Sequence, residues 1–324
     1  PDAAMDVLRR ASGQQTLSID LKIEPTSDHT CYYRYSVDEG RWKVIGNNPV
    51  SACKGAYDYF KHHKMGVYTW SGSSLNLPAN FPQTESKHVV SPFMHHYYFN
   101  VCTFGYTMAY WDWSRWEKEI DWMALHGIDM PLAYVAYEAI IARVWKKMGI
   151  KEEYINGFFT GPAHLPWLEM GNISKIDGPL NQDWYNRQIA LQHKILKRMR
   201  SLGMKPICPA FAGYVPAEFK ESFPNAQIMV SKSMQFFENS MLSPYDPLFG
   251  QILTNYIKEW EKEFGACEYY QADSFNEVDI PFPPKGSKER AELMATYSEK
   301  VYQAIRAGNP NAIWTMQGWM FGYQ

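Results

Sequence analysis

A repeated order of amphipathic helix, glycine and apolar strand limits the possible folds of this chain more than any other feature. The repeat starts with SRWEKEIDWMALHG, after which IDMPLAY reads as a strand. Later helices are predicted in YEAIIARVWKKMG, from Trp184 to Leu202, in LFGQILTNYIKEWEKEFG and in ERAELMATYSEKVYQAIRAG. Strands that alternate with helices in this way are parallel, and each helix is the crossover between two of them.

The first of these helices illustrates the local signals. Ser114, followed by Glu117 three residues later, predicts a capping box at its start. Its apolar residues recur at the spacing of one helix face, and Gly127 is expected to end it. The face consists of Trp113, Trp116, Ile120 and Met123.

Two architectures fit such a repeat, a (β/α)8 barrel and an open doubly wound sheet. No glycine-rich phosphate loop follows any predicted strand, which disfavours a nucleotide-binding open sheet. Polar and aromatic residues instead follow the strands, where barrel active sites form. We count five barrel strands, with the first in HHYYFNVCTF and the last in AIWTMQGW. A barrel needs eight, so either sequence beyond this chain completes it or the barrel prediction is wrong.

The first 90 residues predict a small accessory α/β domain, and 91–324 predict the barrel. Strands are expected in LSIDLKI, CYYRYSV and RWKVI, because apolar and polar residues alternate there. Helices are predicted at Ala3–Ala11 and Pro49–Phe60, two short strands at GVYTW and SLNL, and a linker at Pro78–Pro92. The stretch AQIMV is apolar but has no clear place in this scheme.

Composition excludes several classes of protein. The formal net charge is −2, and no basic block stands out, which disfavours nucleic-acid and anionic-membrane partners. No signal peptide or transmembrane run is recognisable. The five cysteines are scattered, without the spacing of a zinc site or a disulfide framework, so most are expected to be buried thiols. Aromatic residues make up 16% of the chain, and their rings are suited to stacking on flat ligands such as sugars.

The strongest candidate for chemistry is Glu277, in the stretch EYYQADSFNEVDIP. A strand that ends on Asn276-Glu277 and passes into a proline-rich loop places a carboxylate at the mouth of a site. A carboxyl group held against apolar surface has a raised pKa, which a general acid near neutral pH requires. If Glu277 is such an acid, we expect its carboxyl group to lie against apolar surface. The alternative is a solvated loop residue.

Glycoside hydrolysis needs a second carboxylate. Asp129, Glu138 and Asp273 are candidates within this chain, but Glu138 reads as an exposed helix residue, and the two aspartates are in strands. Trp167 and Trp319 are either sugar-stacking residues or core tryptophans. The adjacent pairs His62-His63 and His95-His96 are expected to point to opposite faces, which disfavours a metal site, and Asn172-Ile173-Ser174 matches a glycosylation sequon.

Six segments in collinear order resemble the α-N-acetylglucosaminidases of glycoside hydrolase family 89: HHYYFNVCTFGY, WDWSRWEKEIDWMALHGID, FFTGPAHLPWLEMGN, KPICPAFAGYVP, ADSFNEVDIP and WTMQGWMF. The resemblance implies a small α/β domain, a (β/α)8-type barrel and a further helical domain. It also implies a retaining enzyme that removes terminal α-linked N-acetylglucosamine with two glutamates and no cofactor. The setting it implies is secreted, periplasmic or lysosomal.

By this resemblance Glu277 matches the family's acid/base. Positions around the bound sugar are matched by Asn100, Cys102, Tyr106, Trp167, Asn276 and Trp319. The nucleophile is expected beyond Gln324, in a C-terminal remainder that would complete the barrel. The family often has a tryptophan in the segment near VSKSMQFF, where this chain has Met234 or Phe236, and this difference affects the wall that would face the aglycone.

Three other functions fit the residues. A substrate-assisted β-N-acetylhexosaminidase would use Asp273 and Glu277 as its working pair. A catalytically inactive chain would bind sugar without turnover. A purely structural module would leave the polar strand ends without a role.

Overall fold

The computed structural model of residues 1–324 describes the whole chain except residues 29, 234–235, 274, 279–282 and 320–324. The chain divides into two compact units, and each is described by itself. The first consists of 1–98, 111–131 and 194–206, and the second of 99–110, 132–193 and 207–324.

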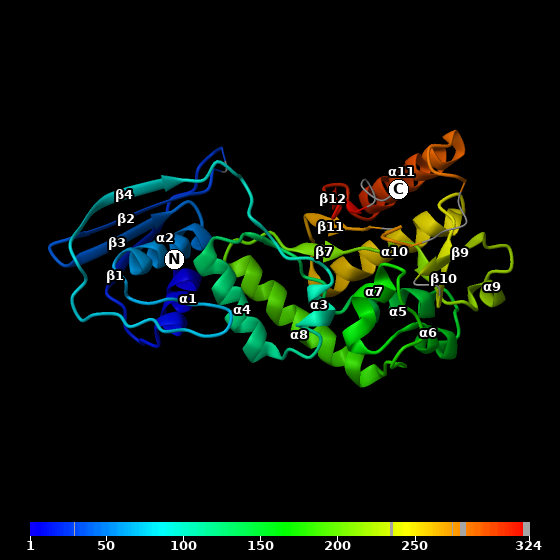
Figure 1. Ribbon diagram of the computed structural model, residues 1–324, viewed down its shortest axis with the longest axis horizontal. Coiled ribbons are helices and arrows are strands. Elements are labelled where there is room, and N and C mark those ends of the chain that lie inside the picture. The colour runs from blue at the N-terminus through cyan, green and yellow to red at the C-terminus, as the bar shows by residue number, and fades with distance from the viewer. Residues whose placement is uncertain (29, 234–235, 274, 279–282, 320–324) are drawn as a thin grey trace. The chain divides into compact units, whose positions relative to one another are not determined.

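A four-stranded sheet forms the start of the first unit (Figure 1). Its strands are β1 (Ile19–Ile23), β2 (Tyr32–Asp38), β3 (Arg41–Gly46) and β4 (Thr84–Val90), in the order β1-β3-β2-β4. β1 and β3 are parallel, and the other pairs are antiparallel. In β2 and β3 buried side chains alternate with more exposed ones, as the sequence predicted.

Helices cover this sheet. Helix α2 (Pro49–His62) packs on β1, β2 and β3, and both α1 (Asp2–Ser12) and α4 (Trp113–His126) pack on α2. Helix α2 begins where predicted, because the Asn48 side chain accepts the Ser51 N–H and Pro49 needs no hydrogen bond at the first position. Gly127 ends α4 in the left-handed conformation (φ 79°), also as predicted.

Two predictions for this unit were wrong. The segment Pro78–Pro92 is not a linker, because it contains β4, which pairs with β2. The strand TESKHVV is an edge strand with no buried residue, so it lacks the alternation that identified its neighbours. GVYTW and SLNL do not form strands, and a single bridge joins Tyr68 to Ser73, the residue before SLNL.

The five barrel strands are present. In the first unit β5 (Tyr97–Tyr98) and β6 (Met130–Pro131) are parallel. In the second, β11 (Tyr269–Gln271) lies between β7 (Ile207–Pro209) and β12 (Ile313–Thr315), and all three are parallel. Leu132, directly after β6, forms a parallel bridge with Ile207. This is the pairing that crossover helices between consecutive strands produce.

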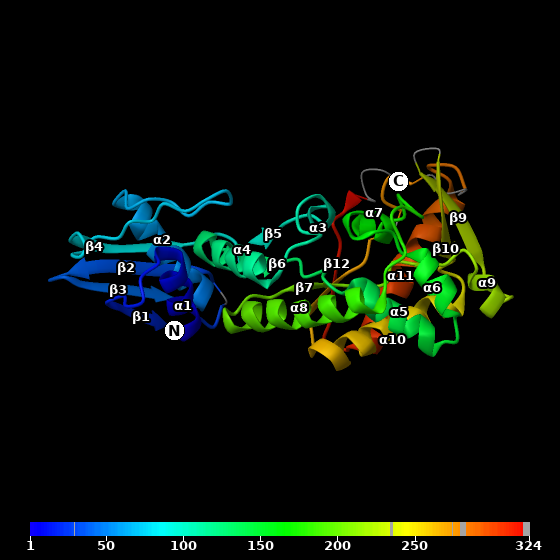
Figure 2. The same ribbon diagram turned by 90° about the horizontal axis from the view of Figure 1, so that it is seen from below.

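In the second unit, helix α11 (Lys288–Gly308) packs on β12, and helix α10 (Pro247–Phe264) packs on α11 and on α5 (Tyr137–Lys147) (Figure 2). Tyr256 and Trp260 of α10 are fully buried, and the Tyr256 ring contacts the ring of Tyr137 in α5 with centroids 5.4 Å apart. The helices that lie wholly or partly in this unit are α3 (Thr103–Tyr106), α5 (Tyr137–Lys147), α6 (Glu152–Phe158), η1 (Pro162–His164), α7 (Leu165–Glu169), α8 (Gln182–Ser201), α9 (Phe219–Ser222), α10 (Pro247–Phe264) and α11 (Lys288–Gly308). Within the described ranges, no helix is both long and apolar enough to span a membrane.

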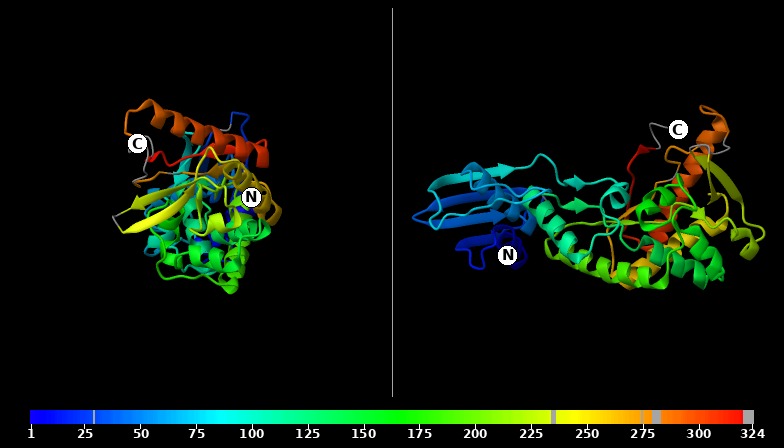
Figure 3. Two further views of the ribbon diagram at one scale, coloured as in Figure 1. Left: turned by 90° about the vertical axis from the view of Figure 1, so that its right-hand side faces the viewer. Right: turned by 60° about the horizontal axis from the view of Figure 1, so that its bottom comes forward.

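An antiparallel sheet occupies the insertion after β7. It has the order β8-β10-β9, with β8 at Tyr214–Val215, β9 at Ile228–Ser233 and β10 at Phe237–Leu242. β9 and β10 form a hairpin, the pair of yellow strands in Figure 3. The AQIMV stretch therefore enters β9. The sequence suggested Met234 or Phe236 for the wall that would face the aglycone. Met234 lies outside the described residues, and Phe236 is 84% exposed.

The start of α4 differs from the predicted capping box. Asp112, not Ser114, is the N-cap, and its Oδ1 accepts the Arg115 N–H at 3.0 Å. Ser114 lies inside the helix and is exposed. Two possible cap residues stand two positions apart here, and the capping-box pattern selected the wrong one.

This assignment predicts unequal effects of two alanine substitutions. Asp112→Ala should lower the free energy of unfolding by about 1 kcal/mol, because the Arg115 N–H loses its acceptor. Ser114→Ala, the matched control, should change it by less than about 0.5 kcal/mol. Denaturant titration of both variants measures the difference. The reverse ranking would show that Ser114 is the cap.

Candidate active site

The segments that follow the five barrel strands meet at one pocket of the second unit. Its lining includes Val101, Tyr134, Ala210, Asp273 and Gln317. These residues follow β5, β6, β7, β11 and β12 respectively, so the pocket lies at the carboxyl ends of the strands. This is where the polar strand ends of the sequence were expected to gather.

The backbone after β11 is strained around the candidate acid. Phe275 (φ 64°) and Glu277 (φ 52°) both adopt the left-handed conformation, which non-glycine residues rarely do. Burial of the Phe275 ring helps to hold this turn, because the ring is fully buried and contacts the Tyr297 ring at 5.0 Å between centroids. The turn leaves Asn276 buried and Glu277 exposed. The expectation that the Glu277 carboxyl group is held against apolar surface is therefore not met in this chain.

Asn276 carries a buried amide with unused hydrogen-bonding capacity. The residue is 4% exposed, and neither its side-chain oxygen nor its nitrogen has a hydrogen-bond partner among the residues that the structure describes. Leaving such a group unpaired costs about 1–3 kcal/mol. A polar ligand group that pairs with this amide would recover that energy, so the position is suited to binding.

Asn172 ties this turn to the Trp167 segment. Its Nδ2 donates to the Asn276 carbonyl oxygen at 2.8 Å, and its N–H donates to the Trp167 carbonyl oxygen at 2.7 Å. The sequence suggested Asn172 only as a glycosylation sequon. Its side chain is buried and its amide is already bonded, so it is a structural residue of the site. No sequence signal marks a partner 104 positions away.

Asn100 and Cys102 form a second polar group of the site. Asn100 Oδ1 accepts the Cys102 N–H at 2.7 Å, which fixes the turn before α3. Asn100 is exposed and Cys102 is half-buried. Burial raises the pKa of the Cys102 thiol, and the negative charge of Glu277 raises it further, so the thiol lies close enough to that carboxylate to sense its charge.

Tyr106 and Trp167 provide an aromatic edge. Their rings meet edge to face with centroids 4.7 Å apart, and Tyr106 is 79% exposed. Gly105 permits this contact, since a Cβ there would lie 2.4 Å from a ring carbon of Trp167. Trp167 is half-buried. Its burial therefore does not decide between a sugar-stacking residue and a core tryptophan.

Trp319 is linked to the site through Asp273. The Gln317 N–H lies 3.0 Å from each Asp273 carboxylate oxygen, and the Gly318 N–H also donates to this group. Asp273 thereby fixes the loop that carries Trp319, which is 48% exposed. Burial raises the pKa of Asp273 to about 6.

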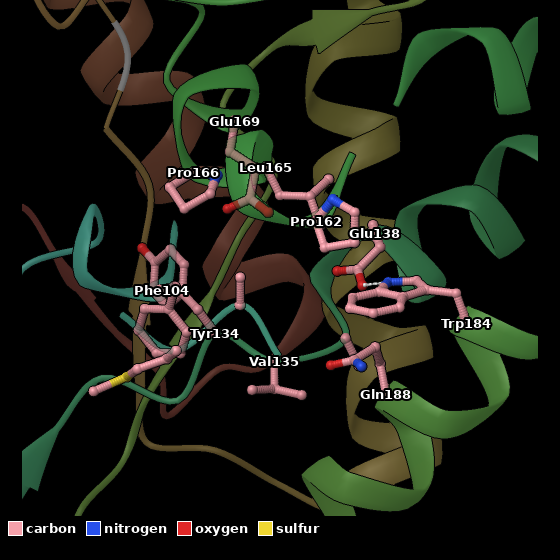
Figure 4. Close-up of a pocket in the computed structure, with 13 residues that line it drawn as sticks. Phe104, Tyr134, Val135, Glu138, Pro162, Leu165, Pro166, Glu169, Trp184 and Gln188 are labelled. Atoms are coloured by element: carbon pink, nitrogen blue, oxygen red, sulfur yellow. Dashed lines mark hydrogen bonds between the residues drawn. The ribbon is translucent and has the colours of Figure 1, made fainter. Parts of the chain in front are cut away.

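The prediction that Glu138 is an exposed helix residue was wrong. Glu138 is 3% exposed, and its Oε1 accepts the Trp184 indole N–H at 2.7 Å. Burial raises its pKa to about 7. Glu169, which we did not identify from the sequence, points into a second pocket, which Glu138, Phe104 and Trp184 also line (Figure 4). Burial and the charge of Glu138 raise the pKa of Glu169 well above its ordinary value.

Asp129 belongs to another cluster, in the first unit. It is 5% exposed, and it accepts hydrogen bonds from the His96 N–H at 2.5 Å and from His95 Nδ1 at 3.0 Å. Both imidazoles therefore approach one carboxylate, so the expectation of opposite faces was wrong for this pair, which precedes β5. In the described part of the chain, no group of three or more His, Cys, Asp or Glu side chains could hold a metal ion.

Comparison with known proteins identifies the family. The family model for the alpha-N-acetylglucosaminidase tim-barrel domain matches residues 96–324, and the model for the N-terminal domain matches 2–83. The chain belongs to the alpha-N-acetylglucosaminidase family. Both the family suggested by the sequence and the predicted fold class, a small N-terminal domain followed by a TIM barrel, are thereby confirmed.

Three similar proteins illustrate the match. Human alpha-N-acetylglucosaminidase is 41% identical over 299 residues, which cover 90% of this chain and 39% of that protein. A family 89 enzyme from Clostridium perfringens, with two glutamates changed to glutamine and with its substrate GlcNAc-α-1,4-galactose bound, has a TM-score of 0.88 at 26% identity, covering 100% of this chain and 37% of that one. An exo-β-N-acetylglucosaminidase from Vibrio harveyi has a TM-score of 0.52 at 11% identity, covering 97% and 49%, and shares the fold alone. The chain thus spans less than half the length of each of these relatives.

The raised pKa of Glu138 predicts a pH-dependent stability. Between about pH 4.5 and 7 the folded chain retains a proton that the unfolded chain has lost, so this carboxyl group reduces stability as the pH rises through that window. Glu138→Gln keeps an acceptor for Trp184 and cannot titrate. Relative to this variant, the wild type should lose at most about 3 kcal/mol across the window.

Unfolding titrations at several pH values measure this difference. The matched control is Glu153→Gln, at an exposed glutamate of α6, which should run parallel to the wild type. A constant difference between wild type and Glu138→Gln from pH 4.5 to 7 would contradict the prediction.

Proposed function

We propose that this chain is part of a retaining exo-glycosidase that releases terminal α-linked N-acetylglucosamine from glycans. The observation that carries the proposal is the Asn276-Glu277 pair after β11, with a buried unpaired amide beside an exposed carboxylate. The name of the human relative and the GlcNAc-α-1,4-galactose bound to the Clostridium perfringens relative support the choice of substrate.

In this proposal Glu277 is the general acid/base. It protonates the glycosidic oxygen as the bond breaks, and in the second step it takes a proton from the attacking water. The 2-acetamido group of an α-linked N-acetylglucosaminide lies on the same face as the leaving group and cannot displace it from behind. The enzyme must therefore supply a nucleophile, a second glutamate expected beyond Gln324, about 5 Å from the acid/base.

The other site residues bind the sugar. Asn276 and Asn100 offer amide groups to its hydroxyl or acetamido groups. Cys102 lies near the Glu277 charge and would contact the same ring. The rings of Tyr106, Trp167 and Trp319 provide the apolar surfaces on which a sugar face stacks.

We further propose that residues 1–90 form an accessory domain and that 91–324 form the N-terminal part of the catalytic barrel. The partner of this part is the C-terminal remainder of the enzyme, which supplies the other barrel strands and a helical domain. On this proposal the chain alone is inactive. The compartment follows from the family resemblance and is secreted, periplasmic or lysosomal.

The role of Glu277 predicts a large effect on a poor leaving group. In the full-length enzyme, Glu277→Gln should slow hydrolysis of an alkyl α-N-acetylglucosaminide by on the order of 10²–10⁴-fold, because the departing alkoxide loses its proton donor. An aryl glycoside with an acidic phenol needs little protonation, so formation of its glycosyl-enzyme should slow far less. Steady-state and burst kinetics on both substrates measure the contrast.

Glu153→Gln is again the matched control and should keep full activity on both substrates. Equal slowing of glycosyl-enzyme formation from the alkyl and the aryl glycoside would indicate a disrupted site and not a missing acid. Unchanged activity of Glu277→Gln would remove Glu277 from the mechanism.

A thiazoline inhibitor separates the proposal from substrate-assisted catalysis. N-acetylglucosamine-thiazoline mimics the oxazoline that a β-N-acetylhexosaminidase forms from the substrate's own acetamide. The full-length enzyme should bind it no better than N-acetylglucosamine itself. Both oxygens of the Asp273 carboxylate already accept the Gln317 N–H, which agrees with a structural role for this residue. Potent inhibition together with hydrolysis of β-linked substrates would establish the alternative.

A further inference from the structure

Two cysteine sulfurs meet inside the second unit, where neither the sequence nor the proposed chemistry assigns them a role. Cys208 is the middle residue of β7, and Cys267 lies two residues before β11. Their Sγ atoms are 2.6 Å apart, although the residues are 59 positions apart in sequence. Cys208 is fully buried and Cys267 is 4% exposed.

This separation is far shorter than ordinary contact. Carbon atoms at their optimal separation lie about 3.5–4.0 Å apart, and sulfur is larger. A disulfide bond measures about 2.05 Å. The two sulfurs are therefore closer to bonding distance than to contact distance. The parallel pairing of β7 with β11 makes the two segments neighbours, and Cys208 lies opposite Tyr270, three residues past Cys267.

We propose that Cys208 and Cys267 are a redox modification site, which a low-molecular-weight disulfide such as glutathione disulfide oxidises to one intramolecular disulfide. The Cys267 thiolate attacks a sulfur of the small disulfide and releases the first small thiol. Cys208 then attacks Cys267 in the mixed disulfide and releases the second. The two protein thiols lose two electrons and two protons, and the two released thiols gain them.

Burial decides when the reaction occurs. Both sulfurs are shielded in the folded chain, so the oxidant reaches them during folding or in a local opening of the strands. An oxidising compartment favours the disulfide, and a reducing one keeps the thiols. The product would tie β7 to the strand that leads to Glu277 and would stabilise the fold by restricting the unfolded chain.

Peptide mapping of the full-length enzyme tests the site. The folded protein is equilibrated with glutathione disulfide, unfolded in the presence of N-ethylmaleimide, digested without reduction and analysed by mass spectrometry. We expect one cross-linked peptide pair that contains Cys208 and Cys267. Cys53 is the internal control, because its Sγ contacts the Ala4 carbonyl oxygen in the first unit, and it should be alkylated.

Thermal unfolding with and without dithiothreitol gives a second readout. Reduction should lower the midpoint of the oxidised wild type by several degrees and leave Cys208→Ala and Cys267→Ala unchanged. If either variant fails to fold, the wild-type peptide map still decides. Alkylation of both cysteines, or glutathione on Cys267 with alkylated Cys208, would overturn the proposal.

Discussion

The parallel register of β11 with its two neighbours is the constraint on which the candidate site depends. Gln271 lies opposite Pro209 on one side and Thr315 on the other. Two residues further along each strand, this register brings Asp273 opposite Gln317, and the Asp273 carboxylate accepts the Gln317 N–H. A shift by one residue would separate this pair and turn each side chain to the other face of its strand. The backbone ladder therefore positions both the Glu277 turn and the Trp319 loop.

Besides the β-ladder, the site depends on a strained turn. Its backbone conformation costs free energy that the surrounding fold must offset. Phe275 and Glu277 occupy a backbone conformation that costs on the order of 1 kcal/mol or more per residue. Complete burial of the Phe275 ring offsets part of that cost, and the Asn172 amide bonds the carbonyl between the two residues. The strain and the unpaired Asn276 amide occur in the same turn. Such a combination is typical of a surface shaped to bind a ligand.

Local sequence patterns predicted the elements, because their signals lie within a few residues. The helix–glycine–strand repeat identified all five barrel strands, and the strand ends identified the segments that line the pocket. Glu277, Trp167 and Trp319 were candidates from the residues alone, the other site residues rest on family resemblance, and all of them stay predictions. The capping box failed at α4 because Asp112 and Ser114 compete at one helix start, and β4 escaped because an edge strand has no buried face.

Partners far apart in sequence explain the remaining errors. Glu138 resembles a solvated helix residue, but Trp184 supplies its hydrogen bond from 46 positions away. Asn172 and Asp273 similarly gain their roles from residues 104 and 44 positions away. A single sequence has no local signal for such contacts, whereas apolar periodicity repeats within each element. Positions of buried polar groups were therefore less predictable than the strands that carry them.

The exposure of the site residues agrees with the proposal that this chain is part of a longer enzyme. Glu277, Tyr106 and Trp319 are all exposed, whereas general acids that act near neutral pH are usually shielded from water. Stacking rings also gain most when sugar and protein cover them together. The chain covers 39% of the human relative, so a relative of that size has ample further polypeptide to form such a cover. On the proposed function, this part of the enzyme positions the acid and one wall of the site, and the remainder supplies the nucleophile and excludes the water.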